Sequence, residues 1–179
     1  MYSPSEDTFL MNKALSKLHL QGLKVLEVGC GNSYNSFFCA EQGAKVFALD
    51  IDKEAIEISK KEAHARSLNI TFIYSDMFTS IHEKDFDLIF FNPPYLISDK
   101  IKHIDLDGGK KGRLFIDKFI ESFAEFLNPK GKVLLLHTDY NDLAETKEKL
   151  KKKGFTCKIV EEESFFFERL FILEIFIDN

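Results

Sequence analysis

Short apolar runs alternate with amphipathic segments along the chain from residue 24 onward. The apolar runs predict strands at 25–28, 45–49, 70–74, 86–91 and 132–137. Apolar residues at helical spacing predict helices at 33–42, after Asp52, at 114–127 and at 142–153. Two further strand-like runs, 155–160 and 169–177, follow each other without a helix between them. This order predicts a doubly wound α/β fold, a mostly parallel sheet with one antiparallel strand and helices on both faces.

The connection between the strands predicted at 70–74 and 86–91 is too short for a full helix. It can still cross the sheet, because about ten extended residues reach roughly 33 Å and three strand spacings need only about 14 Å. The chain has 179 residues and shows no internal repeat or linker. We therefore expect residues 1–179 to form a single domain.

The composition narrows the class of protein. A formal net charge of −5 and a pI near 5.6 argue against broad, unaided binding to nucleic acid. Cys30, Cys39 and Cys157 show no C-x-x-C spacing and form no ligand pattern with the histidines, so we expect no metal and a reducing compartment. No apolar run approaches the ~18 residues that a membrane span needs, and the amino terminus lacks a signal-peptide pattern. We expect a cytoplasmic protein that does not contact a membrane.

The sequence Asn92-Pro93-Pro94-Tyr95 follows directly on the apolar run 86–91. Prolines cannot donate ladder hydrogen bonds, so the chain must leave the sheet here. Ligands of open α/β sheets bind at the carboxyl ends of the strands. The Asn92 amide oxygen and the Pro93 carbonyl can each accept one N–H, while Tyr95 can stack on a flat π-face. The turn therefore predicts a site for a planar, conjugated amine, with an ordinary strand-ending turn as the alternative.

A second motif lies between the first strand and the helix that follows it. In Glu27-Val28-Gly29-Cys30-Gly31 the glycines allow a sharp turn and close approach of a ligand to the backbone. Asp50 ends the next strand about twenty residues on, where a carboxylate can bind ribose hydroxyls. Tyr34 stands where a dinucleotide fingerprint has its third glycine, which argues against a nicotinamide cofactor. Asp76 lies at the end of the third strand, where its carboxylate could accept a hydrogen bond from an adenine amino group. The alternative is that Asp76 only caps a helix or turn.

These motifs together resemble a known family. Glu27 to Gly31, Asp50, Ser75-Asp76-Met77-Phe78 and Asn92 to Tyr95 are similar in order and spacing to a class I S-adenosylmethionine-dependent methyltransferase. Residues 2–10 and the loop Gly108-Gly109-Lys110-Lys111-Gly112-Arg113 narrow the resemblance to the HemK-type release-factor glutamine methyltransferases, in their short archaeal and eukaryotic branch. The resemblance runs from Tyr2 to at least Arg113. It implies one class I domain with a Rossmann-like, seven-stranded sheet whose seventh strand is antiparallel and whose third strand lies at an edge.

The resemblance also implies a site, with S-adenosylmethionine as the cofactor. The cofactor-binding residues that it implies are Glu6, Asp7, Thr8, Glu27, Gly29, Gly31, Asp50, Asp76, Met77 and Asn92. Among them, Glu27 is expected under the methionine moiety, Asp50 at the ribose and Asp76 at the adenine. The expected catalytic residues are Asn92, Pro93 and Tyr95.

The implied reaction is N5-methylation of a glutamine side chain, most simply that of a translation release factor. N6-adenine methylation of DNA or RNA is the alternative, because adenine and a carboxamide both present a planar NH₂ and share the Asn-Pro-Pro-Tyr turn. A non-enzymatic cofactor-binding module is disfavoured by the complete set of Asp50, Asp76 and Asn92. By resemblance, a small zinc-binding activator subunit is expected along the strand at 70–74, with a plain edge strand as the alternative.

The loop after the Asn-Pro-Pro-Tyr turn is rich in basic residues. They are Lys100, Lys102, Lys110, Lys111 and Arg113. This cluster predicts either a solvated loop or a basic rim that faces an RNA-like or acidic partner. His103, in the same loop, could act as a base, although loop histidines more often face solvent.

Overall fold

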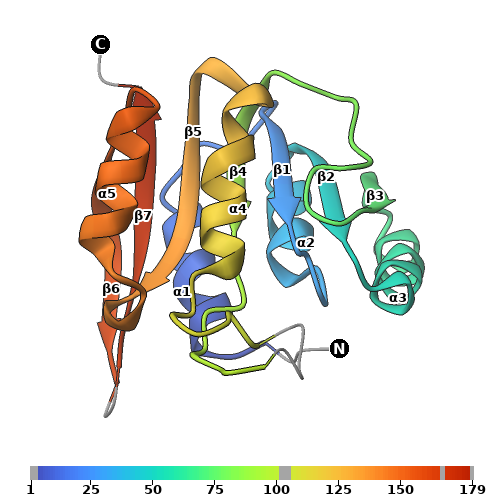
Figure 1. Cartoon of the computed structure of the whole chain (residues 1–179). Coiled ribbons are helices and arrows are strands. Elements are labelled where there is room, and N and C mark those ends of the chain that lie inside the picture. Colours follow the sequence, from blue (N-terminus) through green and yellow to red (C-terminus); the bar gives the residue numbers. More distant parts are fainter. Residues whose placement is uncertain (1–3, 101–105, 166–167, 178–179) are drawn as a thin grey trace.

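The computed structural model describes residues 4–100, 106–165 and 168–177 (Figure 1). Within these residues the strands form one seven-stranded sheet in the order β3-β2-β1-β4-β5-β7-β6. The strands are β1 (Lys24–Val28), β2 (Lys45–Asp50), β3 (Ile70–Tyr74), β4 (Phe86–Phe91), β5 (Leu127–Thr138), β6 (Phe155–Ser164) and β7 (Arg169–Ile177). Strands β1 to β5 pair in parallel, whereas β7 pairs antiparallel with both β5 and β6. The predicted sheet, with one antiparallel strand and β3 at an edge, is confirmed.

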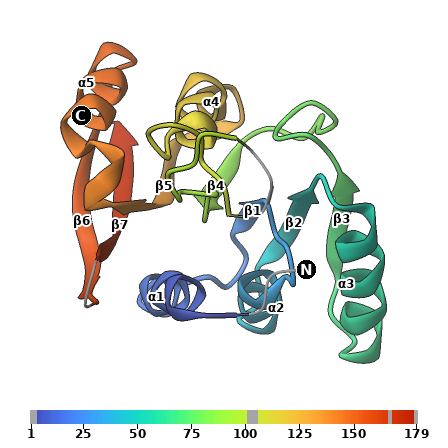
Figure 2. The same ribbon diagram turned by 60° about the horizontal axis from the view of Figure 1, so that its bottom comes forward.

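Helices cover both faces of the sheet. The helices are α1 (Glu6–Leu15), α2 (Tyr34–Glu41), α3 (Lys53–Ala65), α4 (Leu114–Ser122) and α5 (Leu143–Lys152). Helices α1 and α2 lie on one face, α4 and α5 lie on the other, and α3 packs against β2 and β3 (Figure 2). None of these helices is long and apolar enough to cross a membrane, as far as the described residues extend.

Side chains alternate along the strands between two hydrophobic cores, one on each face. Val133 and Leu135 of β5 belong to the core under α4, whereas Leu134 and Leu136 belong to the core under α1 and α2. The core under α4 is rich in phenylalanine, and the Phe119 ring lies 5.1 Å from that of Phe91, centroid to centroid. Strands buried on both faces are apolar along their whole length. This explains why short continuous apolar runs located them in the sequence.

Helix α3 forms as its sequence predicts. The Asp52 carboxylate caps it by accepting from the backbone N–H of Glu54 at 2.8 Å and of Ala55 at 3.2 Å. Its buried face consists of the four residues that share one face at helical spacing, namely Ala55, Ile56, Ser59 and Ala63. The connection from β3 to β4 contains no helix and passes β2 and β1, also as predicted.

Other boundaries differ from the prediction. The apolar pattern did not reveal α1, and α4 ends at Ser122 rather than at residue 127. The reason is that the sheet begins earlier: the Phe126 carbonyl accepts from Phe86 N at 2.9 Å, and Leu127 already pairs with Phe86. Strand β5 therefore starts at Leu127 rather than at residue 132, and residues 128–131 form an irregularity inside it. Strand β6 extends to Ser164 because it pairs with β7 along that length.

Candidate active site

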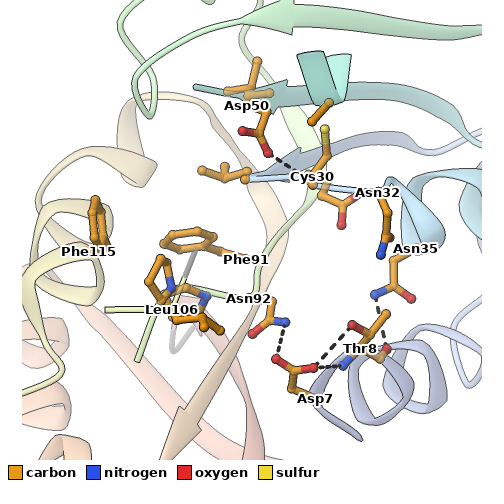
Figure 3. A pocket seen from close by; sticks show the side chains of 18 of the residues that line it. Asp7, Thr8, Cys30, Asn32, Asn35, Asp50, Phe91, Asn92, Leu106 and Phe115 are labelled. Carbon is orange, nitrogen blue, oxygen red and sulfur yellow. Dashed lines mark hydrogen bonds between the residues drawn. The ribbon is translucent and has the colours of Figure 1, made fainter. Parts of the chain in front are cut away.

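A cavity of about 640 Å³ opens at the carboxyl ends of the parallel strands β1 to β4 (Figure 3). This volume lies within the roughly 300–1,000 Å³ that is usual for small-molecule sites. The structure brings together in its lining every residue predicted from the sequence to bind a cofactor or to act in catalysis. These residues are Glu6, Asp7, Thr8, Glu27, Gly29, Gly31, Asp50, Asp76, Met77, Asn92, Pro93 and Tyr95.

The turn after β1 forms part of the cavity wall. Gly29 and Gly31 have φ values of +64° and +50°, in the left-handed region that favours glycine. A Cβ atom on Gly29 would lie 3.2 Å from Cε2 of Phe91, so the bare backbone lets this turn pack against the ring. The turn therefore needs glycine both for its conformation and for the space beside Phe91.

Asp50 ends β2 beside this turn. Its Oδ2 accepts from Gly31 N at 2.6 Å, and its Oδ1 accepts from Asp52 N at 2.8 Å. Burial raises the pKa of the Asp50 carboxyl, and these two backbone hydrogen bonds act in the opposite direction. The bonds fix a carboxyl group at one end of the cavity (Figure 3). There it can accept hydrogen bonds from paired hydroxyl groups such as those of a ribose.

Glu27 is a buried carboxyl group in the cavity lining. Burial raises its pKa from 4.5 to about 8, and the Ser36 hydroxyl, which donates to Glu27 Oε2, opposes this shift. A cationic ligand group beside Glu27 would favour the charged form of the carboxyl. The cavity thus offers, on the side of β1, a carboxyl group that a bound cation would favour in its charged form.

Asn92 lies at the other end of the cavity, next to Asp7 (Figure 3). Its Nδ2 donates to Asp7 Oδ2 at 3.0 Å. Its Oδ1 is buried and has no hydrogen-bond partner within the parts of the chain that the structure describes. A buried acceptor without a partner costs roughly 1–3 kcal/mol. The geometry therefore presents an acceptor to the N–H group of a ligand.

The rest of the Asn-Pro-Pro-Tyr turn is held by the glycine-rich loop, residues 108–113, and by Asn141. Pro93 is buried and Tyr95 is half-buried. The Tyr95 carbonyl accepts from Asn141 Nδ2 at 3.1 Å. Gly112 packs against the same carbonyl, since a Cβ atom there would lie 2.2 Å from Tyr95 O. The turn is thus supported from two sides at its backbone.

The prediction that Arg113 belongs to a solvated loop or a basic rim is wrong. Its side chain is 3% exposed, because it lies under the loop and against α5. Its guanidinium donates to the carbonyls of Asn141 and Asp142, to Thr146 Oγ1 and to Asp117 Oδ1. The lysines Lys100, Lys110 and Lys111 are exposed. Lys102 and His103, as well as Tyr2 and Ser3 of the amino-terminal motif, lie outside the described residues.

Residues that the sequence did not single out also line the cavity. They include Asn35, Leu106, Phe115 and Glu168. Asn35 Nδ2 donates to the Thr8 carbonyl at 3.3 Å and so ties α2 to the start of α1. Leu106 and Phe115 flank the glycine-rich loop in the sequence, and this proximity to a motif could have identified them as candidate site residues. Glu168 lies just before β7 and far from any motif, so the sequence gives no signal that it lines the cavity.

The protein has the Rossmann-like fold of class I methyltransferases. This follows from the order of its strands, its antiparallel strand β7 and the cavity at the carboxyl ends of the parallel strands. Residues 6–167 match the family model of the methyltransferase small domain, and the chain belongs to this family.

Individual relatives are named as methyltransferases, and one of them is named for glutamine. A Methanocaldococcus jannaschii protein, provisionally named a protein N5-glutamine methyltransferase, is 36% identical over 180 residues, which cover 97% of this chain and 90% of that protein. Human methyltransferase HEMK2 is 29% identical over 169 residues, 86% of this chain and 79% of that protein. A chain of the E. cuniculi Mtq2–Trm112 complex has the same fold, with a TM-score of 0.83 at 24% identity over 99% of this chain and 98% of that chain. The resemblance to the HemK-type family is confirmed.

Proposed function

We propose that the chain transfers a methyl group from S-adenosylmethionine to the side-chain nitrogen of a glutamine in a translation release factor. The observation that carries the proposal is the buried Oδ1 of Asn92 at the carboxyl end of β4, which has no hydrogen-bond partner in the described part of the chain. The name of the M. jannaschii relative supports glutamine as the target. The E. cuniculi complex, described as responsible for methylation of the termination factor eRF1, supports a release factor as the substrate.

The chemistry of the cavity lining fits S-adenosylmethionine. Asp50 would accept hydrogen bonds from the ribose hydroxyls, and the exposed Asp76, beside Met77, would meet the adenine. Glu27 would face the ammonium group of the methionine moiety, with Glu6, Asp7 and Thr8 on the same side. When bound, this cofactor supplies a methyl group activated by a sulfonium. The residues of the chain have to place the acceptor nitrogen and stabilise the charge that develops on it.

An amide nitrogen is a poor nucleophile, because its lone pair is delocalised into the carbonyl. Asn92 Oδ1 and the Pro93 carbonyl would each accept one N–H of the substrate carboxamide, which fixes the NH₂ group. As positive charge develops on the nitrogen, the same two oxygens stabilise its protons, one of which would be released to solvent after the transfer, and Tyr95 stacks on the flat carboxamide. Positioning and electrostatic stabilisation can each supply several kcal/mol, so no strong general base is needed.

We further propose that a small partner subunit, of the zinc-binding kind, pairs along β3. Among the described residues this strand lies at one edge of the sheet, so one row of its backbone N–H and C=O groups has no strand neighbour there. Tyr74 at its end is 48% exposed. The similar E. cuniculi structure is a complex with Trm112, which supports a partner of this type. We place the protein in the cytoplasm, in keeping with its three free cysteines.

Transfer of a labelled methyl group tests the function. Label is followed onto a release factor bearing a Gly-Gly-Gln segment and onto DNA and RNA, with and without the candidate zinc-binding subunit. We expect label on the glutamine and a loss of about 10²–10³-fold in kcat in Asn92→Ala. Calorimetry should show that this variant still binds S-adenosylmethionine.

The matched control is Asn69→Ala, which removes an exposed asparagine outside the cavity and should leave turnover unchanged. Unchanged turnover in Asn92→Ala would refute the mechanism. Label on nucleic acid alone would make the chain an adenine methyltransferase. Cofactor binding without transfer to any of these substrates would favour a non-enzymatic module.

A further inference from the structure

The orientation of the Asn92 amide matters because its two ends have opposite hydrogen-bonding character. The oxygen accepts and the NH₂ group donates, yet both ends have nearly the same shape. A free asparagine could turn either end toward a substrate amine. In this structure the NH₂ end donates to Asp7 Oδ2 at 3.0 Å, and the buried oxygen is left for the cavity.

Asp7 is itself held firmly. Its side chain belongs to the first turn of α1 and is 4% exposed. Its Oδ1 accepts from Thr8 N at 2.6 Å and from the Ser5 hydroxyl at 2.9 Å. With these donors on Oδ1, Oδ2 is directed to Asn92 (Figure 3).

The support continues away from the cavity into α2. The Thr8 carbonyl accepts from Asn35 Nδ2 at 3.3 Å, and Asn35 Oδ1 accepts from Asn12 Nδ2 at 3.1 Å. Asn35 is 4% exposed. A partly buried chain of hydrogen bonds therefore connects two helices to the end of β4, and its Asn92–Asp7 bond joins residues 85 positions apart in the sequence.

We infer that Asp7 is a positioning residue, which keeps the oxygen of Asn92 turned toward the substrate amine. This inference rests on the proposed function. A carboxylate can only accept from Asn92, so the reversed amide would bring two oxygen atoms together and would present a donor to the substrate NH₂. The carboxylate also polarises the amide, which makes Oδ1 a stronger acceptor.

An exchange of the two residues tests this inference through methyl transfer. Asn92→Asp places two carboxyl groups against each other, and Asp7→Asn allows the Asn92 amide to reverse. We expect each single variant to lose about 10²-fold in kcat, as misplaced catalytic groups do. The double variant Asp7→Asn/Asn92→Asp restores a donor–acceptor pair and again presents an oxygen. It should be about tenfold more active than Asn92→Asp, as expected for two residues in direct contact.

A second measurement does not depend on any substrate. In the ligand-free protein, the side-chain amide resonances of Asn92 should shift, and their exchange with water should become faster, when Asp7 is replaced by alanine. Unmoved resonances, or a double variant no more active than Asn92→Asp, would overturn the positioning role. Absence of transfer by the unaltered protein would instead count against the proposed function, so the two failures can be told apart.

Discussion

Two buried titratable side chains should make the stability of the ligand-free protein depend on pH in opposite directions. The first is His137, which is fully buried at the end of β5. Its Nδ1 lies 2.8 Å from the Thr138 carbonyl and must donate to it, so Nε2 accepts from the Thr146 hydroxyl at 2.9 Å. Burial lowers the pKa of His137 from 6.5 to about 4, against the opposing effect of the Thr138 carbonyl.

The sign for His137 follows from these two pKa values. As the pH falls below 6.5, the unfolded chain takes up a proton that the folded protein resists until about pH 4. The free energy of unfolding therefore decreases over this window. Between pH 7 and pH 5 the loss is about 2 kcal/mol.

Glu27 acts in the opposite direction. Burial raises its pKa from 4.5 to about 8, so the folded protein keeps a proton that the unfolded chain has lost between these values. The free energy of unfolding therefore falls as the pH rises through this window, and it is regained as the pH is lowered. From pH 7 to pH 5 the gain is about 2.5 kcal/mol, which nearly cancels the loss from His137.

Single variants should separate the two effects. Urea unfolding followed by circular dichroism suits this chain, because it contains no tryptophan. Relative to the unaltered protein, His137→Gln should gain about 2 kcal/mol on going from pH 7 to pH 5, and Glu27→Gln should lose about 2.5 kcal/mol. Other titrating groups are common to all three proteins and cancel in the differences. Three parallel pH profiles would refute the reasoning.

Two further predictions concern the cavity. Because the Glu27 carboxyl must lose its proton to face a cation, affinity for S-adenosylmethionine should rise by up to about tenfold per pH unit from pH 5.5 to pH 7, and calorimetry should find this rise absent in Glu27→Gln. Gly112→Ala should lose kcat and more than about 2 kcal/mol of stability, since its Cβ would lie 2.2 Å from Tyr95 O. The control is Gly154→Ala, because Gly154 also has a positive φ, +81°, but has open space around it. Urea unfolding should show only about 1–2 kcal/mol of destabilisation in this control, with normal methyl transfer. Equal effects in the two variants would contradict this account.

The sheet and the centre of the site could both be predicted from the sequence, because both follow from the apolar runs that mark the parallel strands. Parallel strands buried on both faces are continuously apolar, so β1, β2 and β4 stand out in the sequence together with the residue that follows each. The edge strand β3 is only partly buried, but it still carries the apolar run 70–74. Asp50, Asp76 and Asn92 lie at or just beyond the ends of β2, β3 and β4. Because the carboxyl ends of parallel strands meet at one edge of the sheet, linear order alone brings these side chains to one cavity.

The supports of the site could not be predicted in this way, because they join segments that no period or motif connects. Arg113 illustrates the difficulty, since a charged residue in a lysine-rich loop is expected at the surface. It is buried because backbone carbonyls at Asn141 and Asp142 meet its guanidinium. That contact exists only where the glycine-rich loop folds back between the Asn-Pro-Pro-Tyr turn and α5.

The two motifs therefore act as one structural unit. Gly112 leaves room for the Tyr95 carbonyl, and Asn141 Nδ2 donates both to that carbonyl and to the Gly112 carbonyl, each at 3.1 Å. Arg113 holds the segment that carries Asn141 in place. The glycine-rich loop thus has a physical role that does not require its own contact with a ligand, because it fixes the backbone of the turn from which Asn92 and Pro93 face the cavity.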